Sequence, residues 1–158
     1  MKACNVSVII LLNICKFQGQ TNSLLINDFN LDGWQDIFIA NDFLSNDILY
    51  INNKDKTFKN SAGKVFKHFS LSSMGSDISD INNDGKLDLF VSEMQPYYNK
   101  RKKLFNRQTS YRREQISKNY NYKYQYFRNV LQLNTGINPN TKLPLFSEIG
   151  MHSGVSET

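Results

Sequence analysis

The chain has 158 residues, a formal net charge of +5 and two cysteines, Cys4 and Cys15, which both lie near its start. A disulfide framework therefore does not support the rest of the chain. No nucleophile elbow, P-loop or H-E-x-x-H motif occurs, and His68 and His152 lack a nucleophile-activating neighbour, so we expect a protein that is not an enzyme.

Residues 1–22 contain an apolar run, residues 6–15, after Lys2. The run is long enough for a signal-peptide core and too short to span a membrane. Leu12 to Cys15 weakly resembles a lipoprotein cleavage box, although Ile14 stands where that box has a small residue. A leader predicts an extracellular or cell-envelope location, including association with the outer membrane. The alternatives are a strand at residues 6–12 from a preceding unit, or a start that is not native to the fold.

Two acidic loops with the pattern D-x-N-x-D-G-x-x-D come next, at residues 28–36 and 80–88. Two like charges ~4 Å apart cost roughly 4 kcal/mol at an effective dielectric of 20, so such a loop calls for a cation. Oxygen ligands at alternating positions are typical of Ca²⁺, and the glycine allows the turn. The alternative is a pair of polar turns without an ion. The predicted calcium ligands are the side chains of Asp28, Asn30, Asp32 and Asp36 with the carbonyl of Trp34, and the side chains of Asp80, Asn82, Asp84 and Asp88 with the carbonyl of Lys86.

These loops are not EF-hands. An EF-hand needs a bidentate Glu at position 12, where this chain has Ile39 and Val91. The residues after each loop, 37–40 and 89–92, are rich in β-branched and apolar types and are typical of buried strands. Each loop is therefore expected to join two strands.

The likeness between the two regions extends beyond the loops. Residues 47–52 resemble residues 129–134, and both segments lead through a polar turn to a phenylalanine, Phe58 or Phe146. A unit is thus strand, loop, strand, linker, strand, turn, strand, which is the size of one propeller blade. The predicted fold is all-β, a partial β-propeller of about two four-stranded blades at residues 23–75 and 76–158. Two blades leave open edges, so we expect a fragment whose partners are the remaining blades of a longer chain, or else an assembly of several copies.

The stretches DFNLDGWQDIFIANDF, NDILYINNKDKTF and MGSDISDINNDGKLDLFVSEM resemble the VCBS/FG-GAP repeats of integrin α-subunit heads. The likeness covers about residues 24–158 and is nearest to bacterial surface and secreted proteins with VCBS repeats, often with an ASPIC/UnbV-type region. It implies a calcium-stabilised propeller used for adhesion or for binding a protein or carbohydrate. A further alternative is part of a polysaccharide-active enzyme whose catalytic residues lie outside this segment.

Residues 95–128 depart from the repeat pattern as a basic insertion of net charge +9 that holds seven of the eight tyrosines. Basic residues between aromatics can contact an acidic polysaccharide, an anionic membrane or a nucleic acid, although the absence of nucleic-acid-binding signatures argues against the last. The plain alternative is a solvated excursion whose tyrosines pack onto the blade, with a helix at residues 104–118 and a strand edge at residues 120–126. The residues expected to contact a polyanion are Lys100, Arg101, Lys102, Lys103, Arg112 and Arg113.

Overall fold

The computed structural model describes residues 20–42, 45–96, 98–105, 111, 115, 118–119 and 121–157. The expected leader, both cysteines, Arg112 and Arg113 lie outside this part of the chain.

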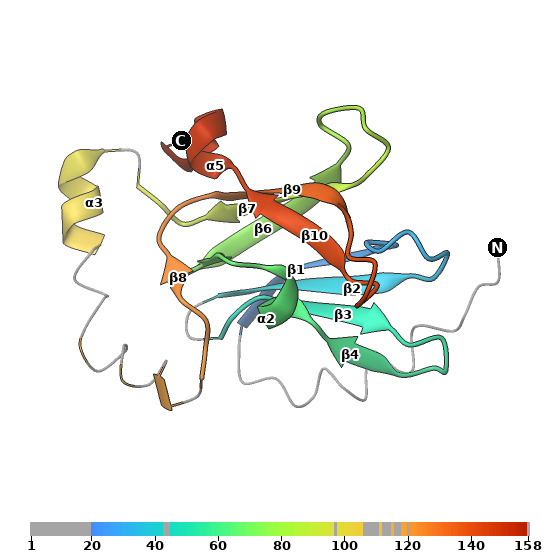
Figure 1. Ribbon diagram of the computed structural model, residues 1–158. Coiled ribbons are helices and arrows are strands. Elements are labelled where there is room, and N and C mark those ends of the chain that lie inside the picture. Colours follow the sequence, from blue (N-terminus) through green and yellow to red (C-terminus); the bar gives the residue numbers. More distant parts are fainter. Residues whose placement is uncertain are drawn as a thin grey trace.

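Two four-stranded antiparallel sheets form the molecule (Figure 1). The strands of the first sheet, in order, are β1 (Gln20–Asn27), β2 (Asp36–Asp42), β3 (Ile48–Asn52) and β4 (Phe58–Asn60). Those of the second are β6 (Ser73–Ser79), β7 (Asp88–Glu93), β9 (Val130–Ile137) and β10 (Pro144–Glu148). The predicted all-β class is confirmed, and each sheet has the expected order of strand, acidic loop, strand, linker, strand, turn, strand. Closure into a propeller ring and the unit boundaries stay predictions.

The repeat is visible in the strand register. Ile26 pairs with Ile37 in the first sheet, and Ile78 pairs with Leu89 at the equivalent place in the second. A register irregularity falls at residues 21–23 and again at residues 73–75. The two halves of the chain thus share backbone detail as well as sequence pattern.

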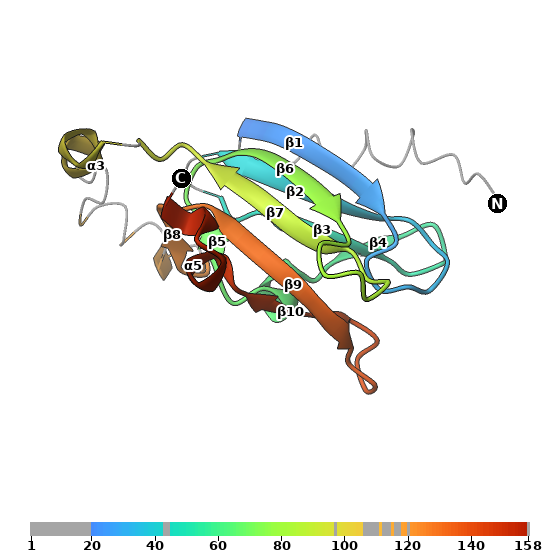
Figure 2. The ribbon, with the colours of Figure 1, turned by 90° about the horizontal axis from the view of Figure 1, so that it is seen from above.

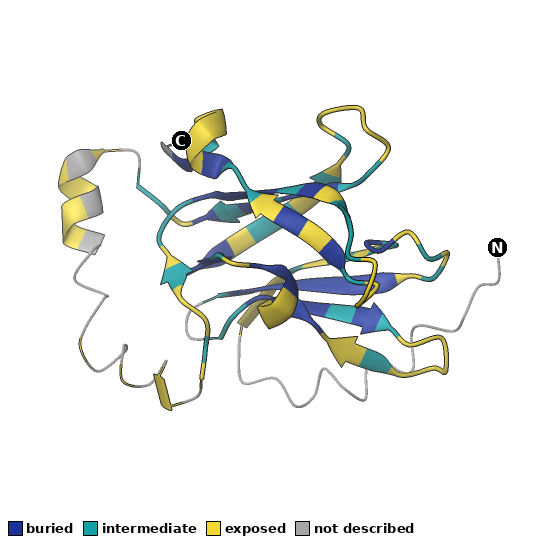
Figure 3. Ribbon diagram, in the orientation of Figure 1, coloured by how far each residue is buried: buried dark blue, intermediate teal, exposed yellow. Residues whose placement is uncertain are grey.

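The core lies between the two sheets, since alternate residues of each strand point to one face. Phe66 is at its centre, with ring centroids 5.9 Å from Phe38, 5.9 Å from Phe69 and 5.3 Å from Phe146. Buried residues concentrate on the middle strands of both sheets (Figure 3). The opposite face of the first sheet carries a smaller cluster of Ile37, Ile39 and Ile48.

Short elements complete the fold. These are the helices α2 (Ala62–Val65), α3 (Asn99–Phe105) and α5 (Gly150–Ser153), the 3-10 helix η2 (Val155–Glu157), and a two-stranded parallel sheet of β5 (Phe69–Ser70) and β8 (Gln125–Tyr126). Within the described residues, no helix has both the length and the apolar character needed to cross a membrane.

The basic insertion leaves the second sheet after β7, at the end opposite the acidic loops (Figures 1 and 2). Helix α3 begins at Asn99, earlier than the helix expected at residues 104–118, most of which lies outside the described residues. Tyr120 lies outside the described residues and residues 121–124 form no strand, so the strand edge or hairpin expected at residues 120–126 is confirmed at Gln125–Tyr126 alone among the described residues. Its preceding backbone is held instead by the linker of the first sheet: Lys123 N–H donates to Asn46 Oδ1 (2.7 Å), and Asn46 Nδ2 donates to the Lys123 carbonyl (3.1 Å).

The expectation that the tyrosines pack onto the blade is wrong for three of those that the structure describes, and Tyr97 and Tyr120 lie outside the described residues. Tyr98, Tyr111 and Tyr124 are exposed. Tyr126 does pack, edge-to-face on His68 with ring centroids 4.6 Å apart. Bonds from Ser45 and Asn46 in the linker of the first sheet hold Lys123 and Gln125 of the insertion against the sheets.

Candidate metal centre in the two acidic loops

The first acidic loop, between β1 and β2, is closed by its own carboxylates. Asp28 accepts the N–H of Asp32 on Oδ1 (3.0 Å) and that of Gly33 on Oδ2 (2.7 Å). Asp32 Oδ1 in turn accepts the N–H of Trp34 (2.9 Å). Such local bonds are the usual way in which Asp stabilises a turn.

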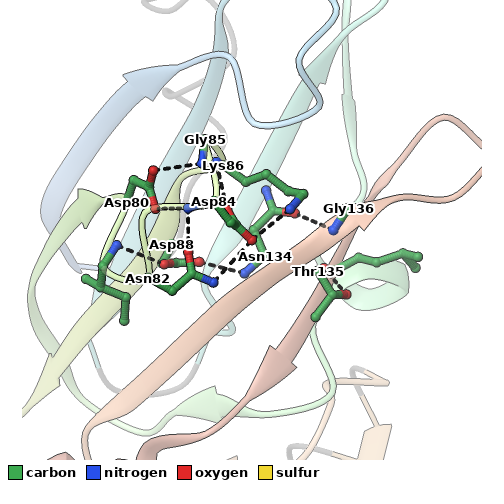
Figure 4. Close-up of polar contacts among 11 residues, drawn as sticks. Asp80, Asn82, Asp84, Gly85, Lys86, Asp88, Asn134, Thr135 and Gly136 are labelled. Carbon is green, nitrogen blue, oxygen red and sulfur yellow. Dashed lines mark hydrogen bonds and ion pairs between the residues drawn. The ribbon is translucent and has the colours of Figure 1, made fainter.

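The second loop, between β6 and β7, repeats these bonds (Figure 4). Asp80 accepts the N–H of Asp84 on Oδ1 (3.0 Å) and that of Gly85 on Oδ2 (2.8 Å). Asp84 Oδ1 accepts the N–H of Lys86 (2.9 Å). The sequence repeat therefore produces the same loop twice.

The glycine of each loop is required by its backbone. Gly33 has φ +85° and Gly85 has φ +80°, in the left-handed region that glycine enters without strain. A Cβ at either position would meet no described atom within 4 Å. Backbone conformation rather than lack of space therefore selects glycine here.

The last aspartate of the first loop, at the start of β2, bonds to both the loop and β3. Asp36 is fully buried; Oδ2 accepts the N–H of Phe29 (3.1 Å) and Oδ1 that of Asn52 at the end of β3 (2.8 Å). Burial raises the pKa of Asp36 to about 7, the two N–H donors oppose this, and the nearby negative charges of Asp32 and Asp28 raise it further. This carboxylate therefore calls for a proton or a cation nearby.

Asp88 makes the same connection in the second loop. Its Oδ2 accepts the N–H of Ile81 (3.1 Å) and its Oδ1 that of Asn134 in β9 (2.8 Å). Asn52 and Asn134 occupy matching ends of the segments that the sequence comparison aligned, which is the signal by which these partners can be recognised.

The carboxamides differ between the loops. Asn30 is 5% exposed, and its Nδ2 donates to Asp32 Oδ2 (3.0 Å). Its Oδ1 is buried without a hydrogen-bond partner among the described residues. A buried acceptor left unpaired costs about 1–3 kcal/mol, so this oxygen is suited to a cation. The equivalent Asn82 is exposed, and its Oδ1 accepts the N–H of Asp84 (3.1 Å).

A lysine contacts the fifth residue of each loop. Lys54 Nζ, from the turn between β3 and β4, lies 3.2 Å from Asp32 Oδ2. Lys86 Nζ lies 2.7 Å from Asp84 Oδ2. The contact of Lys54 has no signal in the sequence, because it is 22 residues from Asp32. The sequence pattern predicts a role only for the carbonyl of Lys86, and not for its ammonium.

The predicted ligands are thus gathered on two loops, but their carboxylates do not converge. In the part of the chain that the structure describes, no three His, Cys, Asp or Glu side chains lie close enough together to hold a metal ion. Their oxygens accept backbone N–H bonds instead. The donor set is nevertheless all oxygen, as Ca²⁺ requires, and Asn30 Oδ1 supplies one acceptor that is still unused.

The expected polyanion contacts lie far from these loops. Lys100, Arg101 and Lys103 are exposed on α3, and Lys102 belongs to the same helix.

Near the base of the insertion, Glu148 Oε2 is 2.8 Å from Arg128 Nη2 and 3.2 Å from His68 Nδ1. His68 therefore joins the insertion to the second sheet, through its ring contact with Tyr126 and its hydrogen bond with Glu148.

Comparison with known proteins gives one match. No curated protein and no solved structure matches the chain. The family model described as FG-GAP-like repeat matches residues 28–91, which include both acidic loops. The likeness to VCBS and ASPIC/UnbV proteins stays a prediction. Residues 28–91, which are less than half of the 158-residue chain, are thus similar to an FG-GAP-like repeat.

Proposed function

We propose that the chain is a calcium-binding β-propeller segment that serves outside the cell as a binding or adhesion module. The buried, unpartnered Oδ1 of Asn30, set among three aspartates, is the observation that carries the proposal. The side chains of Asp28, Asn30, Asp32 and Asp36 with the Trp34 carbonyl would hold one ion, and the equivalent residues 80–88 a second. Calcium would supply charge neutralisation there.

The proposed location outside the cell follows from the expected calcium affinity of the loops. Both loops have few charged ligands and exposed parts, as in modules that bind Ca²⁺ at about 10⁻⁴–10⁻³ M. Such sites fill where calcium is near millimolar, in the extracellular space. The FG-GAP-like repeat supports a role in binding a protein or carbohydrate rather than in catalysis.

Thermal unfolding with and without calcium tests the proposal. Calcium at about 100 times its Kd should stabilise the chain by about 2.7 kcal/mol per site, because it binds the folded state. The double variant Asp32→Ala/Asp84→Ala should lose this gain, and Asp77→Ala, at an exposed position of β6, should keep it. Equilibrium dialysis that finds fewer than one calcium per chain, or a gain that persists in the double variant, would contradict the proposal.

A second candidate function is polyanion binding by α3, favoured by three exposed cations on less than two helical turns. Retention on heparin should fall steeply with salt, by tens of fold in affinity between 50 and 200 mM for about three contacts. The variant Lys100→Gln/Arg101→Gln/Lys103→Gln should lose retention, whereas Lys59→Gln/Lys64→Gln/Lys142→Gln, matched in charge and exposed elsewhere, should keep it. Equal retention of the two triple variants would rule out α3 as the contact.

A further inference from the structure

The same aspartate of each loop meets a lysine, but the lysine comes from a different position in each unit. Lys54 in the first unit is equivalent to Gly136 in the second: the Lys54 N–H donates to Asn52 Oδ1 (2.9 Å) and the Gly136 N–H to Asn134 Oδ1 (3.0 Å). Lys86 is in turn equivalent to Trp34 of the first loop. An ammonium group therefore contacts the fifth residue of the loop in both units, although a lysine at a different position supplies it.

Each ammonium contacts a carboxylate oxygen of a residue that would hold the proposed calcium ion. Lys54 is 3.2 Å from Asp32 Oδ2, and that oxygen also accepts the Nδ2 of Asn30 (3.0 Å). Lys86 is 2.7 Å from Asp84 Oδ2, and that oxygen also accepts the Nδ2 of Asn82 (3.1 Å). An ammonium and a divalent cation repel each other at such distances, so the lysine has to leave when the ion binds.

The two loops would offer a cation different contacts. In the first, it would meet the buried, unpartnered Oδ1 of Asn30 and displace a lysine held at 3.2 Å. In the second, the Oδ1 of Asn82 already has a donor, and the lysine is held at 2.7 Å.

We propose that Lys54 and Lys86 are built-in counter-ions that hold the loops folded without calcium and compete with calcium for Asp32 and Asp84. Lys86 makes the second loop the weaker site, so the first loop fills first. The proposal rests on the calcium binding proposed above. Lys54 and Lys86 would set the calcium concentration at which each loop binds its ion.

Calcium titration of the full chain by calorimetry tests this inference, with Lys54→Met, Lys86→Met and the control Lys64→Met, an exposed lysine of α2. Trp34, the only tryptophan, lies in the first loop and should sensitise the luminescence of Tb³⁺ bound there. Lys86→Met should tighten the weaker site about threefold to tenfold without changing the Trp34-sensitised titration. Lys54→Met should tighten the sensitised site by a similar factor, and Lys64→Met neither.

The outcomes separate the two proposals. Absence of calcium binding in every variant overturns the proposed function. Calcium binding with affinities equal in the wild type and both methionine variants overturns only the counter-ion role. Lys86→Arg keeps the positive charge, so its calcium titration should match that of the wild type. This variant provides the test if Lys86→Met folds only with calcium present. If Lys86→Arg tightens calcium binding as much as is expected for Lys86→Met, the counter-ion role is also overturned.

Discussion

The two acidic loops have the same backbone and different charge balance. In both, the first aspartate closes the turn and the last one reaches the third strand of its sheet. The first loop buries its asparagine and takes a lysine from a neighbouring turn, whereas the second exposes its asparagine and uses its own lysine. Backbone hydrogen bonds are thus what the repeat preserves, and the neutralising charge can be supplied from any position near enough.

If the two loops are equivalent, the largest effect on both is expected when the closing carboxylate is removed. Asp36→Ala and Asp88→Ala each leave two buried or partly buried N–H donors unpaired, which should lower the free energy of unfolding by about 3–6 kcal/mol. Urea unfolding measures both. A loss in only one variant would show that the two aspartates, although equivalent in sequence, do different structural work.

The linker offers a pH test. Asp47 Oδ1 accepts the N–H of Asn41 (3.0 Å) and the hydroxyl of Ser73 (2.8 Å), and burial raises the pKa of Asp47 from 3.8 to about 7. Its equivalent, Asn129, accepts the N–H of Glu93 on Oδ1 (2.8 Å) and carries no charge. Asp47→Asn would therefore make the first unit resemble the second while keeping both bonds.

The direction of the pH dependence of stability follows from the pKa values of Asp47 in the folded and the unfolded chain. Between about pH 4 and 7 the unfolded chain has lost the proton and the folded chain has kept it, so stability falls as the pH rises and levels off above 7. At about 1.4 kcal/mol per pH unit, Asp47 contributes at most about 4 kcal/mol to this fall. Asp47→Asn should remove this contribution and leave that of Asp36, whose pKa is also raised by burial to about 7. Urea unfolding from pH 4 to 8 measures this, with the exposed Asp77→Asn as control. A variant whose pH profile matched the wild type would exclude Asp47 as the cause.

The loop glycines should respond alike. Gly33→Ala and Gly85→Ala force a Cβ into the left-handed region at nearly equal φ, and each should cost about 1–2 kcal/mol of stability. Gly63→Ala, in α2, is the matched control, since its Cβ would make only ordinary contacts with Lys123 at 3.6 Å and beyond. Thermal unfolding with a large difference between the two loop variants would show that their turns are not equivalent.

The smallest effect is expected from an exchange of the seventh residues. Trp34→Lys should weaken the first calcium site about threefold to tenfold, because it adds a positive charge beside Asp32. Lys86→Trp should strengthen the second site and make it visible by sensitised Tb³⁺ luminescence. If the exchange leaves the order of loading unchanged, the burial of Asn30 outweighs the lysines in setting that order.

Local patterns in the sequence predicted the sheets well. The runs of β-branched and aromatic residues after each loop predicted β2 and β7, and the aligned segments at 47–52 and 129–134 predicted β3 and β9. The insertion was predicted poorly, because its described end is fixed by a contact with Asn46, 77 residues away from Lys123. The pairing of Lys54 with Asp32 was missed for the same reason: it depends on how the β3–β4 turn folds over the loop.

The bonds of the closing aspartates have an evolutionary consequence. The donors to Asp36 are Phe29 in its own loop and Asn52 in the same sheet, and the donors to Asp88 are Ile81 and Asn134 at the equivalent places. A gene duplication that copies one whole unit therefore copies a complete loop with its supports, and no compensating change in the neighbouring unit is needed. Arrays of such units can lengthen or shorten by recombination while every ancestral loop stays intact.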